Sequence, residues 1–167
     1  GTGTGMGLVS ATIVGGGAIT ASGTGNWTLS GANAYTGNTT LTSGNLIAGN
    51  DSAFGAGNIV LNGGTLSADA SRTLLNNSTI SASSTIGGTN DITLGNSSSS
   101  LTNTGNVTLA VNNSGATTIA STVALSDTAT NRTLTVNGTG NVTVSGNVTD
   151  GSSSGSNLTY SGNGNII

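Results

Sequence analysis

Short runs of alternating apolar and polar residues recur along the whole chain. Typical runs are Trp27–Leu29, Ile92–Leu94 and Val142–Val144. A period of two predicts half-buried strands, and the β-branched residues Thr, Val and Ile suit a pleated surface. Pairs such as Asn62-Gly63 and Asn137-Gly138 supply turns between the runs. No segment combines a helical period with capping residues, so we expect an all-β chain with no helices.

The composition narrows the choice of β architecture. Gly, Thr, Ser and Asn account for 105 of the 167 residues. A flexible linker can share this composition, but it lacks periodic apolar positions. A sandwich or barrel needs bulkier core residues, whereas stacked coils bury only narrow columns of small aliphatic side chains. With coils of about 20 residues, we expect residues 1–167 to form one parallel β-solenoid of roughly eight coils, on the order of 40 Å long.

The missing residue types exclude most chemistry. The chain has no Cys, His, Lys, Glu or Pro. This excludes zinc sites with Cys or His ligands, thiol nucleophiles, disulfides and Ser-His-Asp triads. With Arg72 and Arg132 as the only basic side chains and a net charge of −3, a nucleic-acid partner is not expected. The apolar runs are too short for a membrane-spanning helix, so we expect no membrane insertion. We predict no catalytic residue and no cofactor.

The acidic residues leave one metal and one enzyme hypothesis open. Their spacing is near one or two coils, so some of them could stack along one edge and bind calcium with nearby Asn and Ser oxygens; these weak calcium candidates are Asp51, Asp69, Asp91, Asp127 and Asp150. The nonapeptide of calcium-binding β-rolls is absent, and we interpret these residues as turn-forming and solubilising. A pair of carboxylates can hydrolyse glycosides, but no neighbouring group could tune their pKa, so we expect no enzyme.

One stretch carries a long, gapless motif. Residues 27–41 read Trp-x-Leu-x-Gly-x-Asn-x-Tyr-x-Gly-x-Thr-x-Leu, and residues 53–66 read Ala-Phe-Gly-x-Gly-x-Ile-x-Leu-x-Gly-Gly-x-Leu. This pattern, within 21–68, resembles the passenger-associated β-strand repeat of bacterial autotransporters. The resemblance implies a right-handed parallel β-helix displayed outside the cell, in a family that includes adhesins and large secreted surface proteins. No translocator domain is visible in the sequence.

Internal similarity extends the resemblance. Residues 131–164 look like the linking coils that such proteins place before a further repeat. Residues 21–28 align with residues 160–167, so we expect 160–167 to begin a next repeat. The chain opens on Gly1 without a signal peptide, which is expected of a mature product or an excised segment.

Two surface patterns have competing interpretations. Trp27, Tyr35 and Phe54 could form a carbohydrate platform, but packing at a corner or in the core of one coil is the favoured interpretation. Thr-x-Thr pairs such as Thr40/Thr42 could form an ice-binding face if every coil repeated them; their irregular spacing favours ordinary strand residues.

The ends of the predicted solenoid suggest a function. Unpaired strand edges are normally protected by Lys, Pro or a cap, and the sequence shows none of these. We expect further coils or a second copy to cover them, and head-to-tail contacts between copies generate a filament. Candidate assembly or packing residues are Trp27, Tyr35, Phe54, Tyr160, Ile166 and Ile167.

Three functional hypotheses follow, all with an extracellular or cell-surface location. The first is a structural fibre that associates with itself. The alternative is an adhesin segment that binds a glycan or a cell-surface protein. The third is a polysaccharide-degrading β-helix enzyme.

Overall fold

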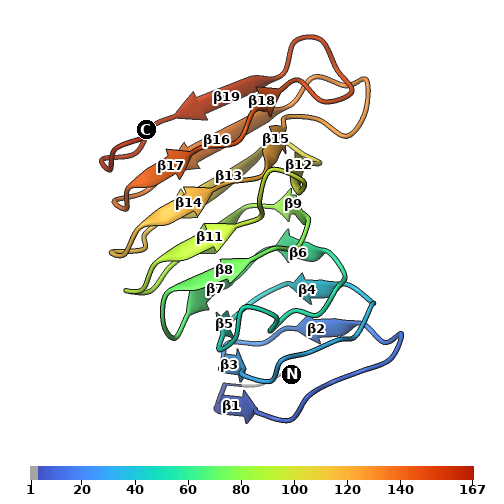
Figure 1. The fold of residues 1–167 in the computed structure, drawn as a ribbon. Coiled ribbons are helices and arrows are strands. Elements are labelled where there is room, and N and C mark those ends of the chain that lie inside the picture. The colour runs from blue at the N-terminus through green and yellow to red at the C-terminus, as the bar shows by residue number, and fades with distance from the viewer. Residues whose placement is uncertain (1–3) are drawn as a thin grey trace.

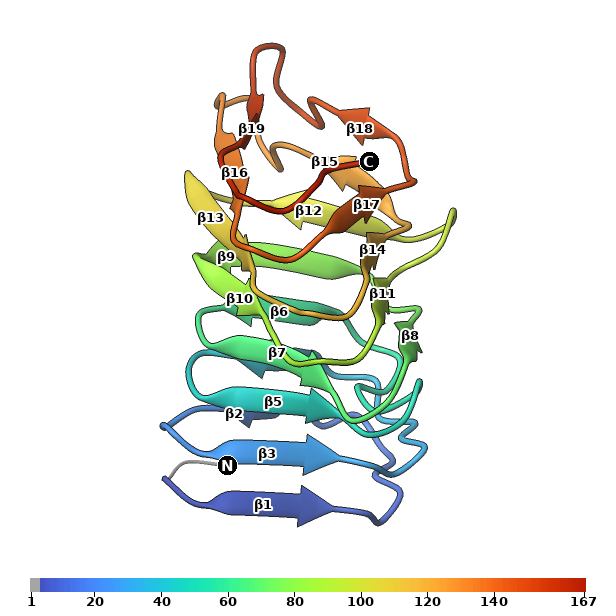
Figure 2. The same ribbon diagram turned by 90° about the vertical axis from the view of Figure 1, so that its left-hand side faces the viewer.

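The computed structural model describes residues 4–167, and none of these residues lies in a helix. The chain winds through about eight stacked turns, and every strand pairs in parallel with strands of the neighbouring turns (Figure 1). This confirms the predicted all-β solenoid. The turns build three sheets that run along the long axis of the molecule (Figure 2).

The eight-stranded sheet has one strand from every turn, in the order β1 (Met6–Val9), β3 (Asn26–Leu29), β5 (Asn45–Ala48), β7 (Thr65–Ala68), β10 (Ser84–Ile86), β13 (Val107–Val111), β16 (Thr133–Asn137) and β19 (Asn157–Tyr160). The seven-stranded sheet comprises β2 (Ile19–Ala21), β4 (Thr39–Leu41), β6 (Ile59–Asn62), β9 (Ser78–Ala82), β12 (Ser100–Asn103), β15 (Thr122–Ala124) and β18 (Val148–Thr149). The four-stranded sheet begins only in the middle of the chain, with β8 (Arg72–Leu74), β11 (Ile92–Leu94), β14 (Thr117–Ile119) and β17 (Val142–Val144).

The coils differ in length along the chain. Cross-coil hydrogen bonds link residues 20 apart in the first coils, as between Ile13 and Asn33. The separation rises to 25 between Ser83 and Thr108 and to 27 between Asn106 and Thr133. The expected coil of about 20 residues therefore holds for the N-terminal part only, because the later coils insert extra residues at their corners.

The core consists of stacked columns of aliphatic side chains. In the eight-stranded sheet, Leu46 pairs with Leu66, which pairs with Ile86, and all three are buried. In the four-stranded sheet, Leu74 pairs with Leu94, and Leu94 pairs with Ile119. Each such side chain contributes about 1.5–3 kcal/mol through burial of its apolar surface.

Asparagine side chains join the coils where the backbone ladders stop. The Asn33 Oδ1 atom accepts a hydrogen bond from the Ile13 N–H at 2.8 Å, and its Nδ2 group donates to the Ala53 carbonyl at 2.7 Å. One buried amide therefore connects three successive coils. The Asn106 Oδ1 atom similarly accepts the Thr133 N–H at 2.8 Å. These bonds give backbone groups partners on the neighbouring coil, of which the Ala53 carbonyl bonded to Asn33 is at a buried site.

One row of threonine residues, distinct from the Thr-x-Thr pairs of the sequence, is in register in the fold. Thr73, Thr93, Thr118 and Thr143 occupy paired positions on successive strands of the four-stranded sheet. The corner loops absorb the unequal spacing, so strand alignment is kept while coil length changes. Because threonine suits pleated surfaces, its high content is sufficient to explain this row.

Candidate functional site at the two ends of the solenoid

Charged side chains are confined to the middle of the chain. All seven lie between Asp51 and Asp150, so residues 4–50 and 151–167 carry none. Charge and proline are the usual means by which natural proteins prevent strand edges from pairing with other chains. The N-terminal end region lacks these protective residues, and the C-terminal end region has one charged side chain, Asp150, next to the edge strand β18 (Val148–Thr149).

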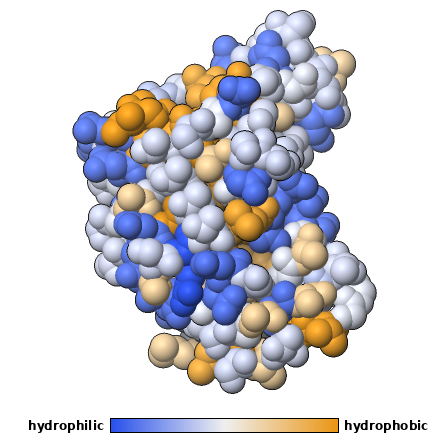
Figure 3. Space-filling view, viewed as in Figure 1, coloured by the Kyte–Doolittle hydropathy of each residue, from blue (hydrophilic) through white to orange (hydrophobic). Residues whose placement is uncertain are grey.

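The first coil exposes several apolar side chains. β1 is the outermost strand of the eight-stranded sheet, and β3 is its partner. Met6 and Leu8 on its outer face are 87% and 67% exposed, and Val14 in the following loop is 70% exposed. Gly7 and Val9 alternate with them and pair with the core-facing residues of β3. Apolar surface is visible on both the lowest and the upper coils in Figure 3.

Trp27 closes the core at the level of the first coil. A Cβ atom added to Gly7 would lie 2.3 Å from the Trp27 Cε3 atom, so the indole fills the space that a side chain at position 7 would need. Trp27 is partly buried and packs against the aliphatic core. Its Nε1 atom is buried and has no hydrogen-bond partner among the described residues.

The last coil presents a second group of core-facing residues near solvent. Leu158 and Tyr160 of β19 pair with Leu134 and Val136 and are only partly buried. The Tyr160 hydroxyl donates a hydrogen bond to the Gly164 carbonyl.

The C-terminal residues extend the four-stranded sheet by one bridge. The Ile167 N–H donates to the Val142 carbonyl at 2.9 Å, and Ile166 forms a parallel bridge with Val142. Ile166 and Ile167 are 40% and 76% exposed. Partly buried core residues therefore lie in the outermost coils at both ends of the part of the chain that the structure describes.

The structure does not gather the five aspartates into one site. Asp69 forms an ion pair with Arg72 at 2.8 Å. The Asp51 Oδ1 atom accepts the Thr73 N–H at 3.1 Å, and Asp91 accepts the Ala116 N–H at 2.8 Å. Within residues 4–167 there is no group of three or more acidic side chains that could hold a metal ion.

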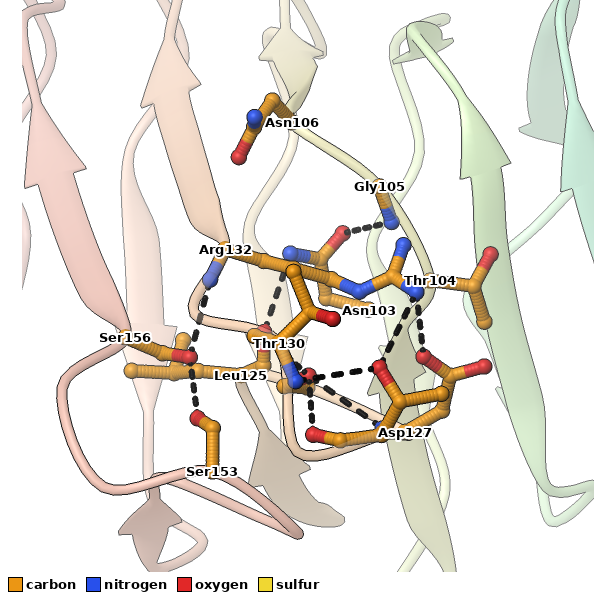
Figure 4. A network of polar contacts seen from close by, with 12 residues as sticks. Asn103, Thr104, Gly105, Asn106, Leu125, Asp127, Thr130, Arg132, Ser153 and Ser156 are labelled. Atoms are coloured by element: carbon orange, nitrogen blue, oxygen red, sulfur yellow. Dashed lines mark hydrogen bonds and ion pairs between the residues drawn. The ribbon is translucent and has the colours of Figure 1, made fainter.

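The fourth aspartate belongs to a polar network at the corner before β16 (Figure 4). Asp127 forms an ion pair with Arg132 at 2.9 Å, and Arg132 also donates to the Thr128 hydroxyl at 3.3 Å. The fifth, Asp150, accepts a hydrogen bond from the Ser153 hydroxyl through its backbone carbonyl. Four of the five carboxylates, those of Asp51, Asp69, Asp91 and Asp127, are therefore bonded within the fold.

The two central aromatic residues lie inside the core. Tyr35 is 1% exposed, and Phe54 is fully buried. Burial raises the pKa of the Tyr35 phenol, an effect partly offset by the hydrogen bond between its hydroxyl and Thr39. Because neither ring faces solvent, Tyr35 and Phe54 offer no platform for a sugar.

One shallow cavity lies at mid-height. It measures about 210 Å³ and is situated between the loop at 51–56 and residues 73–76. Leu75 is 58% exposed there, while the Asn76 side chain donates to the carbonyls of Gly55 and Gly57. The cavity lies where the third side of the solenoid changes from a loop in the shorter N-terminal coils to the four-stranded sheet, which begins with β8.

Comparisons with known proteins give no relative. No protein-family model matches the chain, and none of the curated proteins and none of the solved structures matches it. The likeness to the autotransporter repeat therefore stays a prediction. Among the residues that the structure describes, no helix is long and apolar enough to cross a membrane.

Sequence reasoning missed two residues at the ends. It singled out Trp27, Tyr160, Ile166 and Ile167 but neither Gly7 nor Leu158. The alternation in 6–9 and in 157–160 was a visible signal of end strands. The proximity of Gly7 to Trp27 depends on pairing between residues 20 positions apart, which the alternation does not specify.

Proposed function

We propose that this chain is a structural, extracellular β-solenoid that associates with itself end to end to form a fibre or surface rod. The observation that carries the proposal is that core-facing aliphatic residues lie at both ends of the described solenoid, where Asp150 is the one charged side chain among residues 4–50 and 148–167. A neutral strand edge above an apolar core is a template for another coil. End-to-end stacking would bury both the strand edge and the apolar core.

The geometry of such contacts favours a fibre. The first and last coils are different surfaces, so a contact between them is heterologous. Heterologous contacts that do not close into a ring produce an open filament. In a solenoid the direction of growth is the coil axis, and each added copy continues the eight-stranded sheet.

The aspartates support a structural role more than a catalytic one. Asp69 and Asp127 are held in ion pairs, and Asp51 and Asp91 accept backbone N–H groups from the next coil. A glycosidase needs one carboxylate free to attack or to act as a base and one that stays protonated. We therefore propose no enzymatic activity.

The adhesin alternative has one local feature in its favour. The exposed Leu75 beside the cavity could contact the apolar face of a sugar, and Asp51 lies in the cavity wall. Glycan-array binding that is lost in Leu75→Asp, but kept in Val148→Asp, would support this alternative.

Electron microscopy of the purified chain tests the fibre directly. The proposal predicts uniform unbranched threads whose width is that of one solenoid. Dispersed particles at every concentration would overturn it.

A further inference from the structure

The two end strands of the eight-stranded sheet match each other in length and alternation. β1 and β19 each have four residues with the same pattern of exposure, in which the second and fourth residues are the less exposed. The core-facing positions are Gly7 and Val9 in β1 and Leu158 and Tyr160 in β19. A second copy placed above β19 would therefore bring like faces together.

The core-facing positions also complement each other in size. Gly7 has no side chain, and the Trp27 indole occupies the place that a side chain there would take. At the other end, Leu158 continues a column in which it pairs with the buried Leu134. An aliphatic side chain of a second copy, placed over Gly7, would meet no side chain at position 7 and would contact the Trp27 indole.

The geometry points to a defined junction in which β19 of one copy pairs in parallel with β1 of the next copy. Leu158 lies opposite Gly7 and contacts Trp27, Tyr160 lies opposite Val9, and Thr159 lies opposite Leu8 on the outer face. The partner is a second copy of this chain. This inference rests on the proposed function and specifies the register in which β19 and β1 of two copies pair.

The alternation and the strand lengths select this register. A shift by one residue turns the core-facing side chains to the outer face. A shift by two residues keeps the faces but leaves only half of each four-residue strand paired. Among residues 4–50 and 148–167, Asp150 is the one charged side chain, and it follows β18 and not β19.

Cysteine pairs test the register without background, because the chain has no cysteine. The double variant Thr159→Cys/Leu8→Cys places two cysteines on directly opposite residues of adjacent strands, with Cα atoms about 4.8 Å apart, which is within the Cα–Cα range of a disulfide. The control Thr159→Cys/Ser10→Cys moves one thiol two residues along the same face. Residues 8 and 159 lie at opposite ends of one copy, so any link between them joins two copies.

We expect mild oxidation to convert the first variant into a ladder of linked multimers on a non-reducing gel and to link the control at most weakly. If the unmodified chain forms threads but the control links as well as the test pair, or neither links, the register is wrong while the proposed function stands. If the unmodified chain forms no threads and no sedimenting assemblies, both are wrong.

A second measurement uses the single tryptophan. Assembly should shift Trp27 emission to shorter wavelength, and Leu158→Ser should raise the concentration needed for assembly at least tenfold. Thr159→Ser, on the outer face, is the matched control and should change neither. Circular dichroism of the dispersed variants checks that both remain folded. Equal behaviour of the two folded variants would overturn the contact between Leu158 and Trp27.

Discussion

The first coils and the later coils close the same solenoid in two different ways. In the later coils the third side is a sheet whose core-facing residues include Leu94 and Ile119. In the first coils that side is a loop, and the buried rings of Tyr35 and Phe54 fill the space behind it. A regular third strand is therefore dispensable where a large side chain and a cross-coil amide replace it.

The largest effect is expected from removing an aromatic ring. Phe54→Ala should lower the free energy of unfolding by about 3–5 kcal/mol, because it leaves a cavity in the loop-sided coils. Ile119→Ala, in a coil closed by a strand, should cost about 2–5 kcal/mol and is the matched comparison. Denaturant titration measures both. A cost below about 1 kcal/mol for Phe54→Ala would show that the ring does not close the first coils.

The next effect concerns the amide that joins three coils. Asn33→Ala leaves the Ile13 N–H and the Ala53 carbonyl without this partner and should cost about 1–3 kcal/mol. Asn38→Ala removes a bond at an exposed site and should cost less. Amide hydrogen exchange should show faster exchange at Ile13 in the first variant. Unchanged exchange there would contradict the role given to Asn33.

A smaller effect should appear at alkaline pH. Because the folded-state pKa of Tyr35 is raised above about 10, the folded protein holds this proton more tightly than the unfolded chain. The contribution of this pKa difference to the free energy of unfolding is fully present below the pKa of about 10 that Tyr35 has in the unfolded chain. It is lost as the pH rises through the higher pKa of the folded state. Tyr35→Phe should therefore flatten the alkaline fall in unfolding free energy. An equally steep fall in this variant would rule out Tyr35 as its cause.

The smallest effect is expected at the polar corner of the later coils. Asp127→Asn breaks the ion pair with Arg132 and should change stability by about 0–1 kcal/mol, because both side chains are partly exposed. Asp69→Asn tests the similar pair with Arg72. Thermal unfolding at low and high salt compares them. A loss well above this range would mean that Arg132 organises the corner.

Much of the architecture could be predicted from the sequence, since alternation and turn residues are local signals. The absence of helices within residues 4–167, the parallel stacking and the number of coils are confirmed. The four-stranded sheet could not be predicted, because its runs resemble those of the other sheets and only pairing over 20 to 25 residues separates them. The row from Thr73 to Thr143 was missed for the same reason.

Less of the candidate site than of the fold could be predicted from the sequence. Exposure at the ends follows from which residues face the core of the outermost coils, and this depends on register. Trp27 was identified by residue type, but the space it takes from Gly7 is a property of the fold. The distribution of charge, by contrast, is readable directly from the sequence.

Sedimentation velocity of the unmodified chain, from micromolar to millimolar concentration, tests self-association most directly. End-to-end stacking predicts that the average sedimentation coefficient rises steadily with concentration as longer rods form. A single species with the mass of one chain across the whole range would contradict it.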